Sequence, residues 1–148
     1  MGILCIRDKS DLSDIWSDMS KTAKQNIGKI GEDMAEAWLK RRAYRIVERN
    51  YWKKWGEIDI IAEKDKVIHF IEVKTVSRES VPRAGSDDYS PEDNIHQWKR
   101  QRFARTVETY LLERRINEDQ DWQIDSIAVY LDKEGSVLKV DQLEDIIL

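Results

Sequence analysis

Residues 56–75 contain two apolar runs that are separated by a short charged turn. Polar and apolar side chains alternate within each run, which is typical of a β-strand, so the pair predicts a β-hairpin. A two-residue loop at positions 65–66, or a four-residue loop at 64–67, sets Asp59 directly opposite Glu72. A loop longer or shorter by one residue would separate them onto different faces. Because side chains two residues apart in a strand share a face, Lys74 lies on the face of Glu72.

The predicted neighbours Asp59 and Glu72 carry like charges, which destabilise a strand pair. Two carboxylates and a lysine among Ile, Val and Phe side chains require a bound cation or a shifted pKa. Oxygen ligands of this kind suit Mg²⁺ or Mn²⁺. The alternative is an exposed sheet face with ordinary salt bridges. The apolar side chains Ile68 and Phe70 on the face of Glu72 favour a site over that alternative.

The length of 148 residues, with 41% hydrophobic and 36% charged residues, predicts one soluble, charge-rich globular domain. Cys5 is the only cysteine, which excludes an internal disulfide framework and a cysteine zinc site. A secretory pattern and an apolar run of membrane-spanning length are both missing, so we expect a cytoplasmic protein without membrane association. Residues 1–20 show no firm pattern, and we expect an N-terminal extension followed by a single domain at 21–148.

The net charge of −4 argues by itself against a nucleic-acid partner, but its distribution does not. Between residues 40 and 55 there are seven basic residues and one acidic residue, while residues 117–148 carry two lysines and nine acidic residues. A basic middle is compatible with a local phosphate-binding surface and equally with a solvated, charge-balanced surface. The candidate nucleic-acid-binding side chains are Arg49, Lys53, Lys54, Arg100 and Arg102.

Aromatic residues alternate with these lysines at positions 51–55. Such a segment suits stacking on bases, and it suits packing of a loop onto the sheet equally well. We favour packing for Trp55 and leave both interpretations open for Trp52.

Periodicity predicts two helices and, besides the hairpin, three strands. Glu32 lies at the edge of the apolar arc of the first helix, in which Gly28 and Gly31 suggest a close approach to a neighbouring element. The apolar arc of the second helix includes Trp98, and Lys99 lies within this arc between Ile95 and Phe103. Lys99 either extends to solvent or reaches an acidic partner. The predicted helices are 26–42 and 90–115, and the additional strands are 44–50, 122–131 and 137–140. This order predicts an α/β domain with a central mixed sheet flanked by helices.

The arrangement of an acidic residue in the first helix, an Asp, and then Glu-x-Lys across a hairpin resembles the PD-(D/E)XK restriction-endonuclease-like superfamily. More closely, the chain resembles the YraN-like endonuclease family over about residues 25–130. The residues that carry this resemblance are Gly28, Gly31-Glu32, Ala35, Arg49-Asn50, Gly56-Glu57-Ile58-Asp59-Ile60-Ile61, Phe70-Ile71-Glu72-Val73-Lys74-Thr75, Lys99 and Asp125.

The resemblance implies a restriction-endonuclease-like core and a nuclease that hydrolyses phosphodiester bonds with Mg²⁺ or Mn²⁺. We expect DNA in preference to RNA as its substrate, with branched, damaged and single-stranded forms of DNA all open. Asp59 and Glu72 would hold the metal, and Glu32 and Lys74 would complete the catalytic set. Glu57 and Lys99 are expected to support these residues, whereas His69, on the opposite strand face, is expected to be a packing histidine.

Two further functions stay open at this stage. One is a nucleic-acid-binding module of the same fold without turnover, and the other is a protein-interaction domain that uses the acidic C-terminal part. Many members of the superfamily act as dimers, which leaves a homodimer open.

Overall fold

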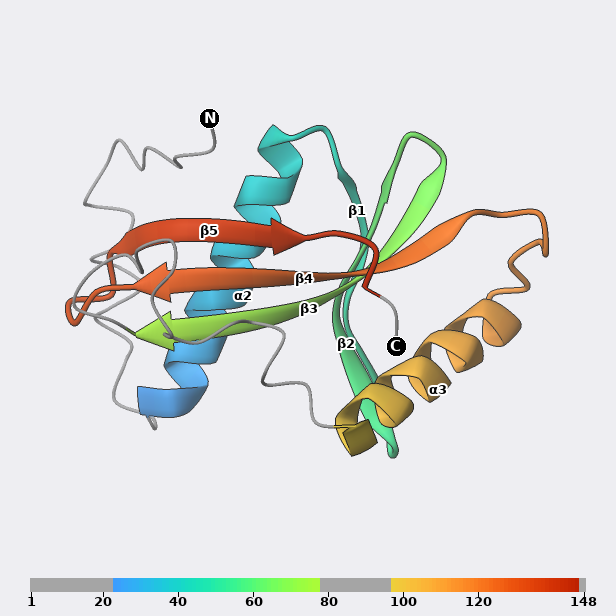
Figure 1. Ribbon diagram of the computed structural model, residues 1–148, viewed down its shortest axis with the longest axis horizontal. Coiled ribbons are helices and arrows are strands. Elements are labelled where there is room, and N and C mark those ends of the chain that lie inside the picture. Colours follow the sequence, from blue (N-terminus) through green and yellow to red (C-terminus); the bar gives the residue numbers. More distant parts are fainter. Residues whose placement is uncertain (1–22, 78–96, 147–148) are drawn as a thin grey trace.

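The computed structural model describes residues 23–77 and 97–146 of the chain. Its elements are two helices and five strands, in the order α2 (Ala23–Arg41), β1 (Arg45–Lys53), β2 (Gly56–Lys64), β3 (Val67–Ser77), α3 (Gln97–Glu113), β4 (Trp122–Leu131) and β5 (Val137–Leu143) (Figure 1). The strands form one sheet in sequence order, in which β3 and β4 are parallel and all other neighbours are antiparallel. This confirms the predicted α/β domain with a central mixed sheet, and it is consistent with a restriction-endonuclease-like core.

The β2–β3 hairpin has the predicted register. Its loop consists of Asp65 and Lys66, which both have positive φ angles (51° and 66°), as two-residue hairpin loops of the favoured kind require. The paired residues run from Lys64 opposite Val67 to Ile60 opposite Ile71. The next position in this register would place Asp59 opposite Glu72, and there the regular pairing ends.

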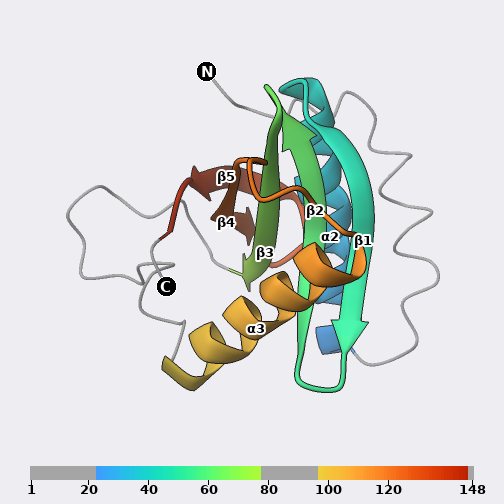
Figure 2. The ribbon, with the colours of Figure 1, turned by 90° about the vertical axis from the view of Figure 1, so that its right-hand side faces the viewer.

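The two helices lie on opposite faces of the sheet (Figure 2), and each packs over a hydrophobic cluster. The first lies under α2, and it contains the buried side chains of Ile30, Met34, Trp38 and Leu39 together with Ile60, Ile71 and the inner face of β4. The second lies under α3, and it contains Phe103, Val107 and Tyr110 together with Ile58, Ile61 and Phe70. Neither described helix is long and apolar enough to cross a membrane.

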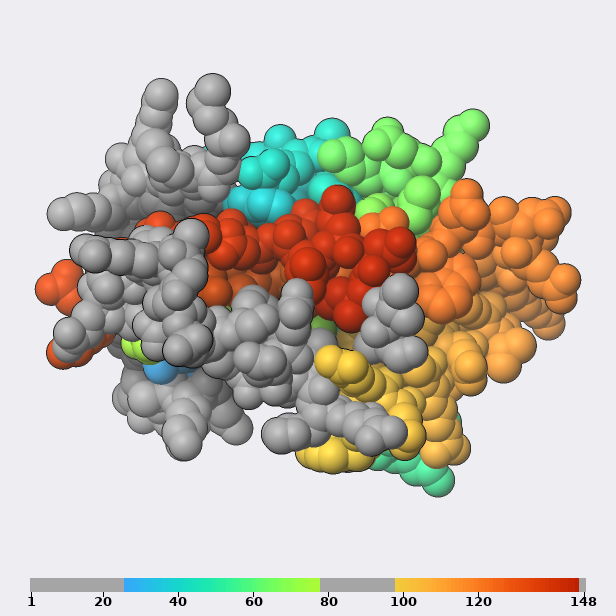
Figure 3. Space-filling view, viewed as in Figure 1, coloured from blue at the N-terminus to red at the C-terminus, as the bar shows by residue number. Residues whose placement is uncertain are grey.

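Two strands are longer than predicted. β1 continues through residues 51–53, which we expected to be a loop, so that only Lys54 and Trp55 form the turn to β2. Tyr51 is buried and pairs with Ile58, and this packing extends the strand. β5 continues to Leu143; it is the outermost strand beside β4 and lies at the surface in the space-filling view (Figure 3).

The second helix differs from the prediction in the exposure of Trp98. The helix is described from Gln97, so its predicted start at residue 90 lies outside the described residues. Trp98, which we placed in the apolar arc, is 58% exposed. The reason is that the contacts of α3 with the core begin at Phe103, one and a half turns further along.

One of the two glycines in α2 marks a close contact with the sheet. A Cβ atom at Gly31 would lie 1.7 Å from Oγ1 and 2.9 Å from Cβ of Thr75 on β3, so only glycine fits there without movement. A Cβ atom at Gly28 would meet nothing within 4 Å. The predicted close approach is therefore confirmed at Gly31 and not at Gly28, and it brings the adjacent Glu32 up to the end of the hairpin.

Candidate functional site

A pocket of about 490 Å³ lies where the turn between β1 and β2, the middle of β3 and the first described turns of α3 meet. Three of the four predicted catalytic residues line it, as do both predicted supporting residues. The lining consists of Trp52, Lys53, Lys54, Gly56, Glu57 and Asp59 from the β1–β2 hairpin, Glu72, Val73 and Lys74 from β3, and Trp98, Lys99, Arg102 and Phe103 from α3.

Asp59 lies at the point where β2 and β3 cease to pair regularly. Its Oδ2 accepts a hydrogen bond of 2.8 Å from the backbone N–H of Val73, so the carboxylate takes the place of a strand carbonyl. Burial raises the pKa of Asp59, and the nearby charges of Glu32, Glu72 and Glu57 raise it further, to about 7, against the opposing effect of the Val73 hydrogen bond. Asp59 therefore gains or loses its proton near neutral pH.

Glu72 is paired with a lysine from the opposite wall of the pocket. Nζ of Lys99 lies 2.5 Å from Oε1 of Glu72, which shows that Lys99 reaches an acidic partner rather than extending to solvent. Lys74 follows two residues later on the same face of β3 and lines the same pocket. Among the residues that the structure describes, Lys74 has no ion-pair partner.

Glu32 approaches the acidic residues from α2 without lining the pocket. The amide of Asn50, oriented with its nitrogen toward the carboxylates, donates to Oε2 of Glu32 at 3.1 Å and to Oε1 of Glu57 at 3.3 Å. Asn50 has a φ angle of 52°, a conformation that asparagine tolerates better than most residues. Burial, followed by the charge of Glu32, raises the pKa of Glu57. The negative charge at the pocket thus comes from four carboxylates on three elements.

Arg49, a predicted nucleic-acid-binding residue, is held by α2 instead of facing the pocket. Its guanidinium nitrogens lie 2.8 Å from Oδ1 of Asp33, 2.7 Å from Oε2 of Glu36 and 3.4 Å from Oε2 of Glu32. These ion pairs connect β1 to the polar face of α2.

The other predicted nucleic-acid-binding residues divide into two groups. Lys53, Lys54 and Arg102 line the pocket, and the first of them also pairs with Glu113 at 2.6 Å. Nε of Arg102 donates to the backbone carbonyl of Trp55 at 2.7 Å, which holds this side chain at the rim. Arg100 does not line the pocket.

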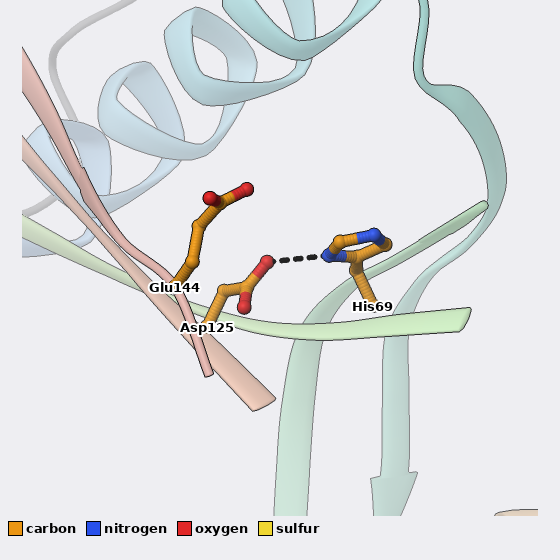
Figure 4. A group of neighbouring side chains, drawn as sticks. All are labelled: His69, Asp125 and Glu144. Atoms are coloured by element: carbon orange, nitrogen blue, oxygen red, sulfur yellow. Dashed lines mark hydrogen bonds and ion pairs between the residues drawn. The ribbon is translucent and has the colours of Figure 1, made fainter. Parts of the chain in front are cut away.

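A buried hydrogen-bond network on the α2 side of the sheet was only partly predicted. His69 is buried, as expected, but it also lies 2.6 Å from Oδ2 of Asp125 through its Nδ1 (Figure 4). Asp125 further accepts hydrogen bonds from the side chains of Gln123 and Gln142 and from the backbone N–H of Asp145. The sequence contains an indication of the His69–Asp125 contact, because both are polar residues at core-facing positions of strands that prove to be adjacent.

This network has the residue types of a metal site but is already saturated with hydrogen bonds. Within the described part of the chain, His69, Asp125 and Glu144 form the one group of three such side chains whose ligand atoms lie within 4.8 Å of one another. Both oxygens of Asp125 are occupied by donors, and Oε1 of Glu144 accepts from the hydroxyl of Tyr44. Burial raises the pKa of Asp125, but its hydrogen bonds outweigh this effect and lower the pKa. We interpret the network as a structural connection between β3, β4 and the end of β5.

Fold and site together define an α/β protein with a carboxylate–lysine pocket at the point where a central hairpin opens. Comparison with known proteins then gives the family. The model of the family described as "Uncharacterised protein family UPF0102" matches residues 31–129, a range that contains Glu32, Asp59, Glu72, Lys74 and Asp125. The chain belongs to the UPF0102 family, which bears out the resemblance to the YraN-like family.

Curated relatives match over most of their own length. A UPF0102 protein from Campylobacter jejuni is 38% identical over 102 residues, which cover 69% of this chain and 81% of that protein. A UPF0102 protein from Campylobacter lari is 38% identical over 106 residues, covering 72% of this chain and 85% of the relative. A UPF0102 protein from Campylobacter fetus is 37% identical over 107 residues, covering 72% and 86%. The predicted extension at residues 1–20 lies outside the range that the family model matches.

Proposed function

We propose that this protein is a Mg²⁺- or Mn²⁺-dependent nuclease that hydrolyses phosphodiester bonds, in DNA rather than RNA. The observation that carries the proposal is the convergence of Asp59, Glu72 and Lys74 in one pocket whose rim is rich in lysine and arginine. The resemblance to the PD-(D/E)XK superfamily supports the same reaction, and its restriction-endonuclease-like members favour DNA.

The residues present fit a hard divalent cation. Asp59 uses Oδ2 for the Val73 hydrogen bond, and its Oδ1 has no donor among the described residues. Burial and, after it, the negative charge of neighbouring carboxylates raise the pKa of Asp59, and a divalent cation would neutralise that charge. No third acidic or histidine side chain within the described ranges forms a close group with Asp59 and Glu72. Two carboxylates with water and substrate phosphate completing the shell are a usual arrangement for Mg²⁺.

Each residue then has a definite part in the reaction. Asp59 and Glu72 would hold the ion, which when bound supplies a Lewis acid for the phosphoryl oxygen and lowers the pKa of the attacking water. Lys74 positions that water or stabilises the negative charge that develops on the phosphoryl group. Lys99 balances the charge of Glu72, and Glu32 increases the negative potential at Asp59 from α2.

A nucleic-acid-binding module without turnover is the second candidate. The ion pair of 2.5 Å between Lys99 and Glu72 favours it, because an internal cation already neutralises one of the two expected metal ligands. In that case Lys99 would stay in place and the pocket would bind phosphates without cleaving them.

A cleavage assay separates these functions. Purified protein is incubated with linear, branched and single-stranded DNA and with RNA, in Mg²⁺, Mn²⁺ or EDTA. We expect metal-dependent cleavage of DNA that Asp59→Ala and Lys74→Ala both abolish. Lys139→Ala, which removes a β5 lysine that does not line the pocket, is the matched control and should cleave normally.

The outcomes lead to different conclusions. Binding without cleavage in any metal would replace the nuclease with the binding module. Failure to bind any nucleic acid at low salt would favour the third function, a protein-interaction domain that uses the acidic C-terminal part.

A further inference from the structure

The pocket has two exposed tryptophans at its rim. Trp52 is 67% exposed and Trp98 is 58% exposed, and both line the pocket that contains Asp59 and Glu72. The other described tryptophans are less exposed or lie elsewhere. Trp38 is buried in the core, and the ring of Trp55 is covered by the guanidinium of Arg105 at 4.4 Å. Trp122 is 44% exposed and does not line the pocket. Large aromatic rings left in water beside a charged pocket are characteristic of a binding surface.

These two rings belong to different walls of the pocket. Trp52 lies near the end of the β1–β2 hairpin, where it pairs with Glu57, and Trp98 lies in the first described turn of α3. The guanidinium of Arg102 lies 5.7 Å from the centre of the Trp98 ring, while its Nε is tied to the Trp55 carbonyl. One wall is thus a strand and the other a helix, and each presents an indole beside basic side chains.

The charges around these rings match a phosphate backbone. Five basic side chains line the pocket, namely Lys53, Lys54, Lys74, Lys99 and Arg102. Aromatic platforms that alternate with basic side chains bind single-stranded nucleic acids, because the bases stack on the rings while the phosphates contact the cations. In a duplex the base faces are already stacked on one another, so a paired base cannot lie on an indole without first leaving the helix.

We propose that the pocket takes an unpaired stretch of nucleic acid, with bases stacked on Trp52 and Trp98 and phosphates directed to its lysines. An unpaired strand would be the substrate class of the proposed nuclease. The inference depends on the proposed function only in that the reacting phosphate would lie at Asp59 and Glu72. Binding of the unpaired strand itself needs neither the metal nor turnover.

The test measures affinity without cleavage. A labelled single-stranded DNA oligonucleotide, the duplex of the same sequence and the matching single-stranded RNA are titrated in EDTA, and fluorescence anisotropy gives each Kd. We expect the wild-type protein to prefer the single strand. Trp52→Ala and Trp98→Ala should each weaken single-strand binding by about tenfold, because base–aromatic stacking contributes at that order, and should change duplex binding little. The RNA arm shows whether the preference extends to both kinds of unpaired strand.

Two controls keep the result specific to stacking. Trp52→Phe and Trp98→Phe retain an aromatic face and should keep most of the affinity. Leu112→Ala removes an apolar side chain of α3 that is 79% exposed and does not line the pocket, and it should bind like the wild type. Thermal unfolding of each variant confirms that the exposed substitutions leave the fold intact.

The result overturns the inference if single strand and duplex bind equally, or if both alanine variants bind the single strand as the wild type does. Either finding would do so even if metal-dependent cleavage were observed, in which case the proposed function would stand alone. Conversely, tryptophan-dependent single-strand binding without cleavage in any metal would support the inference and overturn the nuclease.

Discussion

Asp59 and Asp125 illustrate how the surroundings of a carboxylate decide its pKa. Both lie on central strands, but their pKa values shift in opposite directions. Burial, together with three nearby carboxylates, raises the pKa of Asp59 to about 7, and its one described hydrogen-bond donor opposes this only in part. Asp125 receives four hydrogen bonds and is held ionised. The surroundings of Asp59 destabilise the folded state at neutral pH, as is common at a functional site, whereas those of Asp125 stabilise the fold.

Replacement of Asp59 by asparagine is expected to stabilise the protein at pH 8. The pKa of Asp59 is higher in the folded state than its ordinary value of 3.8, so between about pH 4 and 7 the folded state retains a proton that the unfolded state has lost. Stability therefore falls as pH rises through that window, and Asp59→Asn removes the loss, worth roughly 1–4 kcal/mol. Urea unfolding at pH 8 and pH 4.5 measures it, and the gain should shrink at the lower pH. A variant less stable than the wild type at pH 8 would contradict this account.

Asp125→Asn should behave in the opposite way. The pKa of Asp125 is lowered in the folded state, so its stabilisation is present above the ordinary pKa and is lost as pH falls through the folded value. The new amide cannot accept from every donor that the carboxylate satisfies, and we expect a loss of about 2–4 kcal/mol at pH 7. Urea unfolding extended below about pH 4 should show the difference from wild type diminishing there, and a pH-independent difference would indicate that packing alone is responsible.

A divalent cation should stabilise the wild type in a pH-dependent manner. The cation binds the ionised form of Asp59, so the increase in Tm with millimolar Mg²⁺ should be larger at pH 8 than at pH 6. Asp59→Asn should lose most of this increase, and Lys139→Ala should retain it because Lys139 lies outside the pocket. Equal shifts in the wild type and Asp59→Asn would place the cation elsewhere.

At the scale of the elements, the contact between α2 and β3 positions the site. Thr75 lies so close to Gly31 that the helix backbone approaches the strand beside Glu72 and Lys74. This contact, with the ion pairs of Arg49, fixes the helix turn that carries Glu32. The charge of Glu32 then contributes to the raised pKa of Asp59.

The two glycines of α2 provide a matched pair for this contact. Gly31→Ala forces a Cβ atom against Cβ of Thr75 and should destabilise the protein by about 1–3 kcal/mol. Gly28→Ala meets open space and should stabilise it by up to about 1 kcal/mol, because alanine favours the helix. Urea unfolding of both variants under the same conditions measures the two effects. If Gly31→Ala were as stable as Gly28→Ala, α2 would not be held against β3 at this point.

At the scale of the whole molecule, a chain with a net charge of −4 places five of its 25 basic residues in the lining of one pocket. Binding of a polyanion to such a protein has to be local, since the acidic surface elsewhere repels phosphates. Five basic side chains line the pocket, so a single strand can make at most five phosphate contacts there. A plot of the logarithm of the binding constant against the logarithm of the salt concentration should therefore have a slope no steeper than about −3.5.

Removal of one pocket cation should change that slope by a defined amount. Lys54 is exposed and lines the pocket, so Lys54→Ala should reduce the slope by about 0.7 if the lysine contacts a phosphate. Lys139→Ala removes the same charge from β5, where Lys139 pairs with Asp141, and should leave the slope unchanged. Equal effects of both substitutions would mean that only the net charge matters.

Much of this fold could be predicted because local patterns specify it. Alternating apolar residues and a loop at Asp65 and Lys66 were sufficient for the hairpin register. The ends of β1 and β5 could not be predicted, because pairing and burial extended strands through residues that read as loop or tail. The exposure of Trp98 could not be predicted either. Helical periodicity identifies the apolar face of a helix but not the residue at which the helix begins to pack on the sheet.

The sequence by itself determined which strand positions carry Asp59, Glu72 and Lys74, since the period of a strand and the length of a turn are local properties. Only the tertiary structure decided what surrounds them. It brought Lys99 from α3 to Glu72, assigned Arg49 to α2 instead of the pocket, and joined His69 to Asp125 across β3 and β4. Each of these contacts joins residues far apart in the chain, and their geometry depends on how helices pack on a finished sheet. The β2–β3 hairpin, the sequence feature that most restricted the possible folds, is therefore one wall of a pocket. Which charges face its carboxylates is decided by tertiary packing.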